Sequence, residues 1–489
     1  MNIPFFHKRD GEKKKEKRGG AKEVARTTYV FLALFLGLIA YLVWFAAFKA
    51  DSFINNSYNN KRIDAFAATT IRGEIRSREG RILAQTKVQE DQSEVRYYPE
   101  REVYCHVVGY DTHGKTGVEM TANYYLLKSH ANAFQRLKNT FAGEKSPGDS
   151  VITTLSDPLQ HAAYEALGSF RGAVIAMDPE TGEVLCCVSK PDFDPNRIVS
   201  DYEALSGENG SGVLLNRASQ GRYAPGSVFK ILTTLEFLRE HKEEAENYTF
   251  DCEGSFVSDG KEIRCYHDKA HGTEDLAMSF ANSCNASYAG ISLTLDPKSM
   301  KKTADVMLFD QPVSCQLPTE KPSFSLDAGA TDAERMETGI GQGKTLVTPL
   351  QMLMWVSAVE NQGTAQTPYL LKKVVNAEGQ TIRSFGSKKY RTLMTKQEAE
   401  KLQELMRLVV TDGTGRACLS DSYEAYGKTG TAEYDSEGNA HSWFAGYAVK
   451  DGHEPIAVAV ICEGAGAGSS YAAPVAAKLF QVYFQERLP

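Results

Sequence analysis

The chain lacks the short cysteine and histidine signatures that mark many metal proteins. Its nine cysteines form no Cys-x-x-Cys pair, and no His-Glu-x-x-His stretch is present. Zinc proteins use such spacings to place two ligands on one turn or on one helix face. The sequence alone therefore predicts no metal site and no cofactor.

The cysteines themselves allow two interpretations. Because their number is odd, at least one has no partner within the chain for a disulfide. Cys252 and Cys265 flank a short glycine-containing loop and are the best candidates for a bridge, whose closure would contribute about 3 kcal/mol. The alternative is that the cysteines are small buried hydrophobic residues. The sequence leaves both possibilities open.

Excess basic charge is confined to the N-terminal end. Residues 1–26 contain nine lysines and arginines against four acidic residues, a net charge of +5, and the chain as a whole carries −7. The remainder is therefore strongly acidic at −12. An acidic bulk argues against nucleic acid as a partner.

Long hydrophobic runs are absent except for one stretch. Residues 27–48 carry no charge over 22 positions, and a membrane-spanning helix needs about 20 apolar residues. A cleavable signal peptide is the alternative, but its apolar core is usually about 7–15 residues long and ends in a small-residue cleavage site. We expect a cytoplasmic tail at 1–26, an uncleaved anchor at 27–48 and everything after Lys49 outside the cytoplasm, because the basic residues precede the anchor.

Internal repeats and long low-complexity tracts are also absent. Two folded parts are predicted after the anchor. Residues 49–153 are mixed and polar, contain no catalytic cluster and are expected to form a stalk or docking module. In residues 154–489, strands flank a region, 231–427, that looks mostly helical with loops, and a final helix covers 473–484. Strands are predicted at 172–178, 183–189, 428–431, 442–449 and 456–462. Strands from both ends of this part can share one sheet, which gives an α+β fold.

One stretch near the middle of the chain combines a turn with reactive side chains. Pro225-Gly226 predicts a turn, and apolar residues at helical spacing follow it. Ser227 and Lys230 are three residues apart, so their side chains share one helix face. A serine held beside a lysine can act as a nucleophile with a nearby base. A simple helix-capping serine is the alternative.

Two further clusters follow along the chain. Ser283 and Asn285 lie two residues apart on a loop between predicted helices, where a hydroxyl and an amide can orient a proton relay. The third cluster consists of Lys428, Thr429, Gly430 and Thr431. Its cation would attract a carboxylate, its hydroxyls can hydrogen-bond that group, and its glycine allows close approach to a neighbouring backbone. Each cluster alone is an ordinary loop or turn.

In this order, the Ser-x-x-Lys, Ser-x-Asn and Lys-Thr-Gly clusters resemble the signature of penicillin-binding proteins and serine β-lactamases. Segments 339–343 and 347–352 are similar to the stretch that penicillin-binding transpeptidases carry between their second and third motifs. Within it, Thr348 is expected to cap a helix that has Pro349 in its first position.

The N-terminal part resembles the class B, monofunctional members, of the smaller penicillin-binding protein A type. Residues 72–84 are similar to their Arg-Gly-x-Ile-x-Asp-Arg-x-Gly motif, although Ser77 stands where aspartate is usual. The resemblance covers about residues 50–485. It implies an antiparallel sheet with flanking helices and an all-helical subdomain, preceded by a small module and one transmembrane helix.

The resemblance also implies a peptidoglycan D,D-transpeptidase. Ser227 would attack a D-Ala-D-Ala stem peptide or a β-lactam and form an ester, which an amine of a neighbouring strand would then take up. Lys230 would be the base, Ser283 would pass the proton, and Asn285 would position Lys230 and the peptide. Lys428, Thr429 and Thr431 would hold the terminal carboxylate, Gly430 would line the substrate strand, and the backbone N–H groups of Ser227 and Thr431 would form the oxyanion hole.

Several alternatives share these motifs. A D,D-carboxypeptidase would pass the acyl group to water, and a serine β-lactamase would need a deacylating water and would lack the module at 49–153. A β-lactam sensor or an inactive division scaffold would not be an enzyme. Besides the membrane, the resemblance implies a glycosyltransferase of the SEDS family as partner. It does not distinguish elongation, division and sporulation. His441 is expected to be a loop residue in the wall of the site.

Overall fold

The computed structural model describes residues 10–48, 66–207, 212–434 and 438–485, and the chain divides into two compact units, 1–64 and 65–489. The first unit holds one long helix, α1 (Asp10–Phe48). Within it, Val24–Phe45 is an apolar stretch of mean hydropathy 2.2 whose side chains are exposed. This matches the anchor predicted at 27–48, because one apolar helix is long enough to cross a membrane.

The second unit is built on a five-stranded antiparallel sheet of order β17-β18-β19-β7-β8. Its strands are β7 (Gly172–Met177), β8 (Val184–Lys190), β17 (Glu424–Glu433), β18 (Ala440–Val449) and β19 (Ile456–Cys462). Strands from both ends of this part thus share one sheet, and the predicted α+β fold is confirmed.

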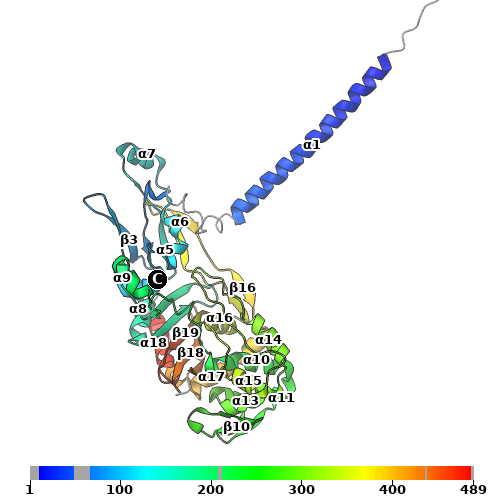
Figure 1. The fold of residues 1–489 in the computed structure, drawn as a ribbon, viewed down its shortest axis with the longest axis vertical. Helices are drawn as coiled ribbons and strands as arrows, with labels where there is room; N and C mark the ends of the chain where they lie inside the picture. The colour runs from blue at the N-terminus through cyan, green and yellow to red at the C-terminus, as the bar shows by residue number, and fades with distance from the viewer. Residues whose placement is uncertain (1–9, 49–65, 208–211, 435–437, 486–489) are drawn as a thin grey trace, which may run out of the picture. The chain divides into compact units, whose positions relative to one another are not determined.

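Helices cover both faces of this sheet (Figure 1). One face packs on α16 (Pro349–Glu360), and the other packs on α8 (Asp157–Leu167) and α18 (Ala472–Gln485). Strands β7 and β19 are therefore buried at every position, which explains their unbroken apolar sequences. Helix α16 begins as predicted, because Thr348 accepts a hydrogen bond from the backbone N–H of Gln351 at 3.1 Å and Pro349 follows the cap.

A helical region lies beside the sheet and carries the first two motifs. Its main elements are the 3-10 turn η4 (Gly226–Phe229), α10 (Lys230–Glu240), α11 (Lys242–Glu246), α12 (Leu276–Ala281), α13 (Asn285–Thr294), α14 (Pro297–Val306), α15 (Asp332–Gly339) and α17 (Lys396–Thr411). Ser227 lies in the 3-10 turn rather than in the first α-helical turn. The hydrogen-bonded turns η4 and α10 follow one another without a gap, so the predicted common face is retained.

The region 231–427, expected to be mostly helical with loops, also contains short strands in two places. The first holds two-stranded sheets made of β9 (Thr249–Cys252) with β12 (Gly272–Asp275) and of β10 (Ser255–Ser258) with β11 (Lys261–Arg264). The second holds β13 (Thr364–Gln366), β14 (Leu371–Val375), β15 (Thr381–Ser384) and β16 (Lys389–Thr392). These strands are three to five residues long and largely polar, so alternation of apolar residues gave no signal.

The segment before the central sheet contributes to a six-stranded sheet of order β15-β14-β6-β2-β3-β4. Its own strands are β2 (Ile75–Arg76), β3 (Ile82–Val88), β4 (Glu94–Tyr97) and β6 (Ser150–Thr153). Strands β2 and β3 flank the turn formed by Arg78, Glu79 and Gly80. Shorter elements around this sheet are β1 (Thr70–Ile71), β5 (Ser146–Pro147), α4 (Cys105–Val108), α5 (Gly117–Thr121), α6 (Asn123–Leu126), α7 (Ala133–Ala142) and α9 (Ile198–Ser206).

The β2–β3 turn is bound to a carboxylate, although Ser77 stands where the similar motif has aspartate. Its hydroxyl donates to Asp157 at 2.9 Å and accepts from the backbone N–H of Arg81 at 3.2 Å. The Arg81 guanidinium donates to the same Asp157 at 3.1 Å. A carboxylate from α8 is thus hydrogen-bonded to both Ser77 and Arg81 of this turn.

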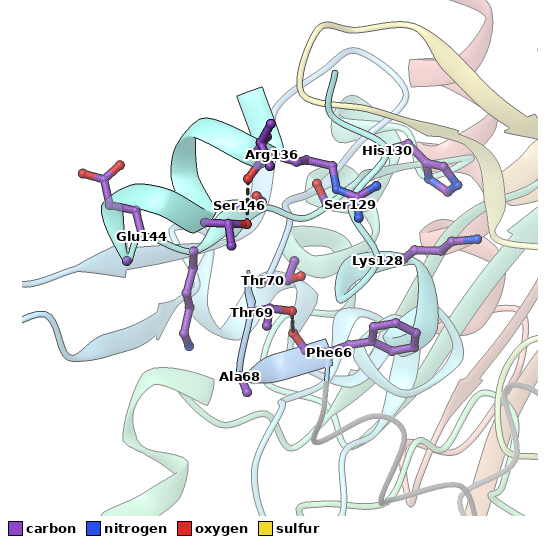
Figure 2. A pocket seen from close by; sticks show the side chains of 14 residues that line it. Phe66, Ala68, Thr69, Thr70, Lys128, Ser129, His130, Arg136, Glu144 and Ser146 are labelled. Atoms are coloured by element: carbon purple, nitrogen blue, oxygen red, sulfur yellow. Dashed lines mark hydrogen bonds between the residues drawn. The ribbon is translucent and has the colours of Figure 1, made fainter. Parts of the chain in front are cut away.

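A cavity of about 830 Å³ lies between α7 and the short strands β1 and β5 (Figure 2). Polar and basic side chains such as Lys128, His130 and Arg136 line it together with Phe66. It contains no residue of the three motifs, so cavity size alone does not locate the chemistry of this chain.

Candidate active site

The structure brings the three sequence motifs together in one cleft of about 620 Å³. Ser227 lines it from η4, Ser283 and Asn285 line it from the α12–α13 connection, and 429–431 line it from β17. The third motif lies in the middle of this ten-residue strand rather than at its start. Residues that are more than 200 positions apart in the sequence thus line the same cleft.

The turn that carries Ser227 is held by two glycines. Gly226 has a φ of +53°, and its N–H donates to the carbonyl of Gly341 at 2.8 Å. Gly341 has a φ of +79°, and a β-carbon there would lie 1.9 Å from the carbonyl oxygen of Gly226. Glycine is therefore required at both positions. The segment 339–343 thereby has a structural role, which is to support the turn that presents Ser227.

Lys230 is completely buried and is held by the second motif. Its Nζ donates to the carbonyl of Ser283 at 2.7 Å, to Oδ1 of Asn285 at 2.8 Å and to Oγ of Ser283 at 3.4 Å. Burial lowers the pKa of Lys230 to about 8. An amine with such a pKa is neutral in about one molecule in ten at pH 7, against about one in 2,500 for a free lysine.

Ser283 connects this lysine to the third motif. Its backbone φ of +59° is rare for a residue with a side chain and is a form of strain that clusters at functional sites. Lys428, also completely buried, donates to Ser283 Oγ at 2.8 Å. Burial and then the nearby charge of Lys230 lower the pKa of Lys428 well below its ordinary value. One hydroxyl thus lies between two amines, which is an arrangement suited to proton transfer.

The remaining residues of the third motif form an edge of the cleft. A β-carbon on Gly430 would lie 3.1 Å from Val228 and 3.2 Å from the carbonyl of Pro225, so the predicted close approach of two backbones is confirmed. Thr429 shares a hydrogen bond with Thr414 at 2.5 Å, and Thr431 Oγ1 accepts from the N–H of Gly468 at 3.5 Å. Their hydroxyls lie at the cleft, where a carboxylate would meet them.

His441 differs from the expectation of a loop residue in the cleft wall. It lies on β18, and its Nδ1 accepts from the N–H of Gly464 at 3.1 Å. Its ring stacks on Tyr434 with centroids 4.4 Å apart. His441 does not belong to the described residues that line the cleft.

Sequence reasoning missed one wall of the cleft, which comes from the connection between β11 and β12. Arg264, Tyr266, His267 and His271 line the cleft from this segment. The carbonyl of Arg264 accepts a hydrogen bond from Nδ2 of Asn285 at 2.9 Å, so this wall is tied to the second motif. A polar loop of this composition carries no pattern that would place it at an active site.

The predicted Cys252–Cys265 disulfide is not formed in the structure. The two sulfurs are 3.7 Å apart, and all nine cysteines are free thiols. Instead, Cys284 and His271 join the pair, and the four ligand-type atoms all lie within 4.8 Å of one another. The sequence motifs gave no support for a metal site, and this grouping of ligand-type atoms appears only in the folded chain. The four residues come from separate elements and have no short-range spacing that the sequence could reveal.

Comparisons with known proteins agree with this geometry. Residues 172–481 match the model of the penicillin binding protein transpeptidase domain, and residues 72–151 match that of the penicillin binding protein A dimerisation domain. The peptidoglycan D,D-transpeptidase PbpA of Mycolicibacterium smegmatis is 27% identical over 92% of this chain and 96% of its own length. The peptidoglycan D,D-transpeptidase MrdA of Acinetobacter baumannii is 29% identical over 80% of this chain, and the match spans 66% of MrdA.

Solved structures give the same result. Penicillin-binding protein A from Mycobacterium tuberculosis, as a ceftriaxone acyl-enzyme complex, has a TM-score of 0.77 at 25% identity over 86% of this chain and 100% of that one. The D,D-transpeptidase domain of a peptidoglycan glycosyltransferase from Eggerthella lenta has a TM-score of 0.76 at 26% identity, over 86% and 99% of the two chains. This chain belongs to the penicillin-binding protein transpeptidase family.

Proposed function

We propose that this protein is a class B peptidoglycan D,D-transpeptidase, a serine enzyme that forms an acyl-enzyme and is acylated by β-lactams. The observation that carries the proposal is the cleft that Ser227 shares with a serine hydroxyl lying between two buried lysines. Its relatives in M. smegmatis and A. baumannii are D,D-transpeptidases, and its relative in M. tuberculosis forms acyl-enzymes with β-lactams.

In the acylation step, Oγ of Ser227 attacks the carbonyl carbon of the penultimate D-alanine. The Ser227 proton passes to Lys230, which burial keeps partly neutral. The peptide C–N bond breaks, and the departing D-alanine amine receives a proton through Ser283. Backbone N–H groups of Ser227 and Thr431 stabilise the oxyanion, and loss of one such donor typically costs about 100- to 1,000-fold in rate.

Substrate binding relies on the third motif. The side chains of Lys428, Thr429 and Thr431 hold the terminal carboxylate of the stem peptide, and Gly430 leaves room for the peptide beside β17. Asn285 positions Lys230 and the peptide amide. In the second step, an amine of a neighbouring strand attacks the ester carbonyl, releases Ser227 and forms the cross-link.

We further propose that α1 anchors the protein with its basic N-terminal residues in the cytoplasm and the second unit outside it. The positive charge before the apolar stretch supports this orientation. Cross-linking acts on glycan strands made nearby, so a membrane-embedded glycosyltransferase of the SEDS family is the proposed partner. Family resemblance supports this partner.

The experiment that tests the function uses the full-length chain in detergent with glycan strands that carry D-Ala-D-Ala stem peptides. A transpeptidase yields cross-linked dimers and releases D-alanine, and Ser227→Ala yields neither. Release of D-alanine without dimers would indicate a D,D-carboxypeptidase. Rapid hydrolysis of free penicillin would indicate a β-lactamase. Acylation by penicillin without dimers or release of D-alanine would indicate a β-lactam sensor, and absence of any acylation would indicate an inactive scaffold.

A further inference from the structure

A cluster of three cysteines and one histidine lies beside the second motif and has no part in the proposed acyl transfer. Cys252 ends β9, Cys265 follows β11, His271 precedes β12, and Cys284 caps α13. The three cysteines are buried, with exposed fractions of 3% or less, and His271 is half-buried.

Three separations within this cluster match the edges of a metal tetrahedron, and all four ligand-type atoms lie within 4.8 Å of one another. The sulfur of Cys265 lies 3.7 Å from that of Cys252 and 3.8 Å from that of Cys284, and Cys252 Sγ lies 3.4 Å from His271 Nδ1. Zinc–sulfur bonds of about 2.3 Å place two sulfurs of a regular tetrahedron about 3.8 Å apart, and the shorter zinc–nitrogen bond brings nitrogen and sulfur slightly closer.

A disulfide accounts for these positions less well. A sulfur–sulfur bond is about 2.05 Å long, and it would join two of the four groups and leave the others without a role. Here Cys265 is nearly equidistant from two cysteines, and a nitrogen ligand completes the set. Three thiolates and an imidazole form a set that soft, tetrahedral ions such as Zn²⁺ prefer.

The strands next to the ligands are short and pack on α12 and α13, and Ile263 of β11 joins the main apolar core. They form two separate two-stranded sheets, and the apolar cluster beneath them consists of the three cysteines and Ala286, with Phe250 and Phe256 packed against it. A bound ion would join both sheets to the start of α13 and supply folding free energy directly.

The cluster is continuous with the proposed catalytic groups. Cys284 lies between Ser283 and Asn285 in the chain, so fixing its sulfur fixes the connection on which the strained Ser283 lies. On the other side, Arg264 precedes Cys265, and its carbonyl accepts from Asn285, which in turn accepts from Lys230. Ser283 and Asn285 are therefore both covalently bonded neighbours of the ligand Cys284. Asn285 is also hydrogen-bonded to the residue that precedes the ligand Cys265.

We propose that Cys252, Cys265, His271 and Cys284 bind one Zn²⁺ ion in a closed structural site that positions the Ser283–Asn285 connection for acylation. Binding converts three thiols to thiolates with release of three protons, and His271 binds through neutral Nδ1, so the centre carries a net charge of −1. With four protein ligands, the ion has no open position for substrate. It is a positioning element rather than a catalytic group.

The first test measures metal in the full-length chain, purified in detergent without chelator or added metal. We expect about one zinc per chain, and nine reactive thiols after denaturation in chelator without reductant. A chain with a Cys252–Cys265 disulfide would show seven thiols and no zinc, and this result would overturn the proposal. Nine thiols with no zinc, before and after exposure to Zn²⁺, would also overturn it.

Variants then assign the ligands. Cys284→Ser and His271→Ala are expected to lose most of the zinc, whereas Cys418→Ala, which removes a buried cysteine outside the cluster, keeps it. Cys252→Asp retains an anionic ligand and is expected to bind zinc more weakly. If the ligand variants fail to fold, titration of the chelator-treated wild-type chain with Co²⁺ replaces them. A thiolate-to-cobalt charge-transfer band that saturates at one equivalent supports the site, and no band refutes it.

The positioning role is tested by acylation with a fluorescent penicillin, a readout that rests on the proposed function. Removal of zinc is expected to slow acylation at least about tenfold, because misplacement of a catalytic group by about 1 Å can cost about 100-fold. Added Zn²⁺ should restore the rate. An unchanged rate in the zinc-free chain would refute the positioning role, whereas absence of acylation in both forms would contradict the proposed function and leave the measured zinc content unaffected.

Discussion

Lys428 donates a hydrogen bond to Ser283 Oγ at 2.8 Å across 145 positions of the chain. The same hydroxyl oxygen lies 3.4 Å from the ammonium of Lys230. Ser283 is therefore the point at which the three motifs meet, since one lysine comes from the first motif and the other from the third. We assign proton transfer to this contact.

Removal of the Ser283 hydroxyl is expected to slow acylation by about 100-fold or more, because it interrupts a proton path and leaves two buried lysines without their shared acceptor. The measurement is the rate of labelling of Ser283→Ala by a fluorescent penicillin. Ser314→Ala, which changes an exposed serine, serves as the control. Equal rates in both variants would remove Ser283 from the mechanism.

The rate of acylation should rise with pH below about 8 and level off above it, because burial lowers the pKa of Lys230 to about 8 and its neutral form is the base. Below that pKa, each pH unit is expected to change the rate about tenfold. Lys230→Arg keeps the charge and cannot readily lose a proton, so we expect it to abolish acylation. A wild-type profile that is flat between pH 6 and 9 would contradict this role.

Gly341→Ala is expected to destabilise the turn that presents Ser227, because the new β-carbon would lie 1.9 Å from the carbonyl of Gly226. Gly379→Ala is a matched control, since Gly379 has the same φ of +79° and a β-carbon added there would have no other atom within 4 Å. The control should lose about 1–2 kcal/mol of unfolding free energy through backbone strain alone. Denaturant unfolding and acylation rates should both show a larger effect at 341.

The six-stranded sheet, of order β15-β14-β6-β2-β3-β4, depends on a buried ion cluster. In this cluster Glu119 pairs with Arg72 and Arg96. Burial alone would raise the pKa of Glu119, but the two guanidinium groups outweigh it and lower the pKa below 4.5. Its contribution to stability is therefore present above about pH 4.5 and lost as pH falls through the lowered value.

Glu119→Gln leaves two buried cations without their partner and should cost about 3–5 kcal/mol of unfolding free energy. Denaturant unfolding at neutral pH measures this loss. Glu404→Gln changes an exposed partner of Lys401 and should stay within about 0.5 kcal/mol of the wild type. A loss at 119 no larger than that at 404 would show that the cluster does not stabilise the sheet.

Local sequence patterns predicted those strands and helices that are marked by an uninterrupted apolar run or by a helix-capping residue. The uninterrupted apolar runs at 172–177 and 456–462 predicted buried strands, and Thr348-Pro349 predicted the start of α16. The motif residues could be recognised because each motif is contiguous. Their meeting at Ser283 could not be derived from spacing, because it depends on how α12, α13 and β17 pack.

The sequence could not reveal the features that depend on contacts between distant segments. Strand β9, which ends at Cys252, and strand β11, which precedes Cys265, are four residues long and largely polar, so no periodicity marks them. The short interval between these two cysteines is compatible with a disulfide and is not a spacing typical of zinc ligands. The distinction rests on Cys284 and His271, which the folded chain brings to the same point.

The measurement that tests the proposed acyl-enzyme chemistry most directly is the intact mass of the full-length chain after exposure to penicillin. We expect that the wild-type chain gains the mass of one penicillin molecule, located on Ser227 by peptide mapping, and that a folded Ser227→Ala chain gains none. A folded wild-type chain that gains no mass, or a Ser227→Ala chain that gains it equally well, would contradict the assignment of Ser227 as the nucleophile.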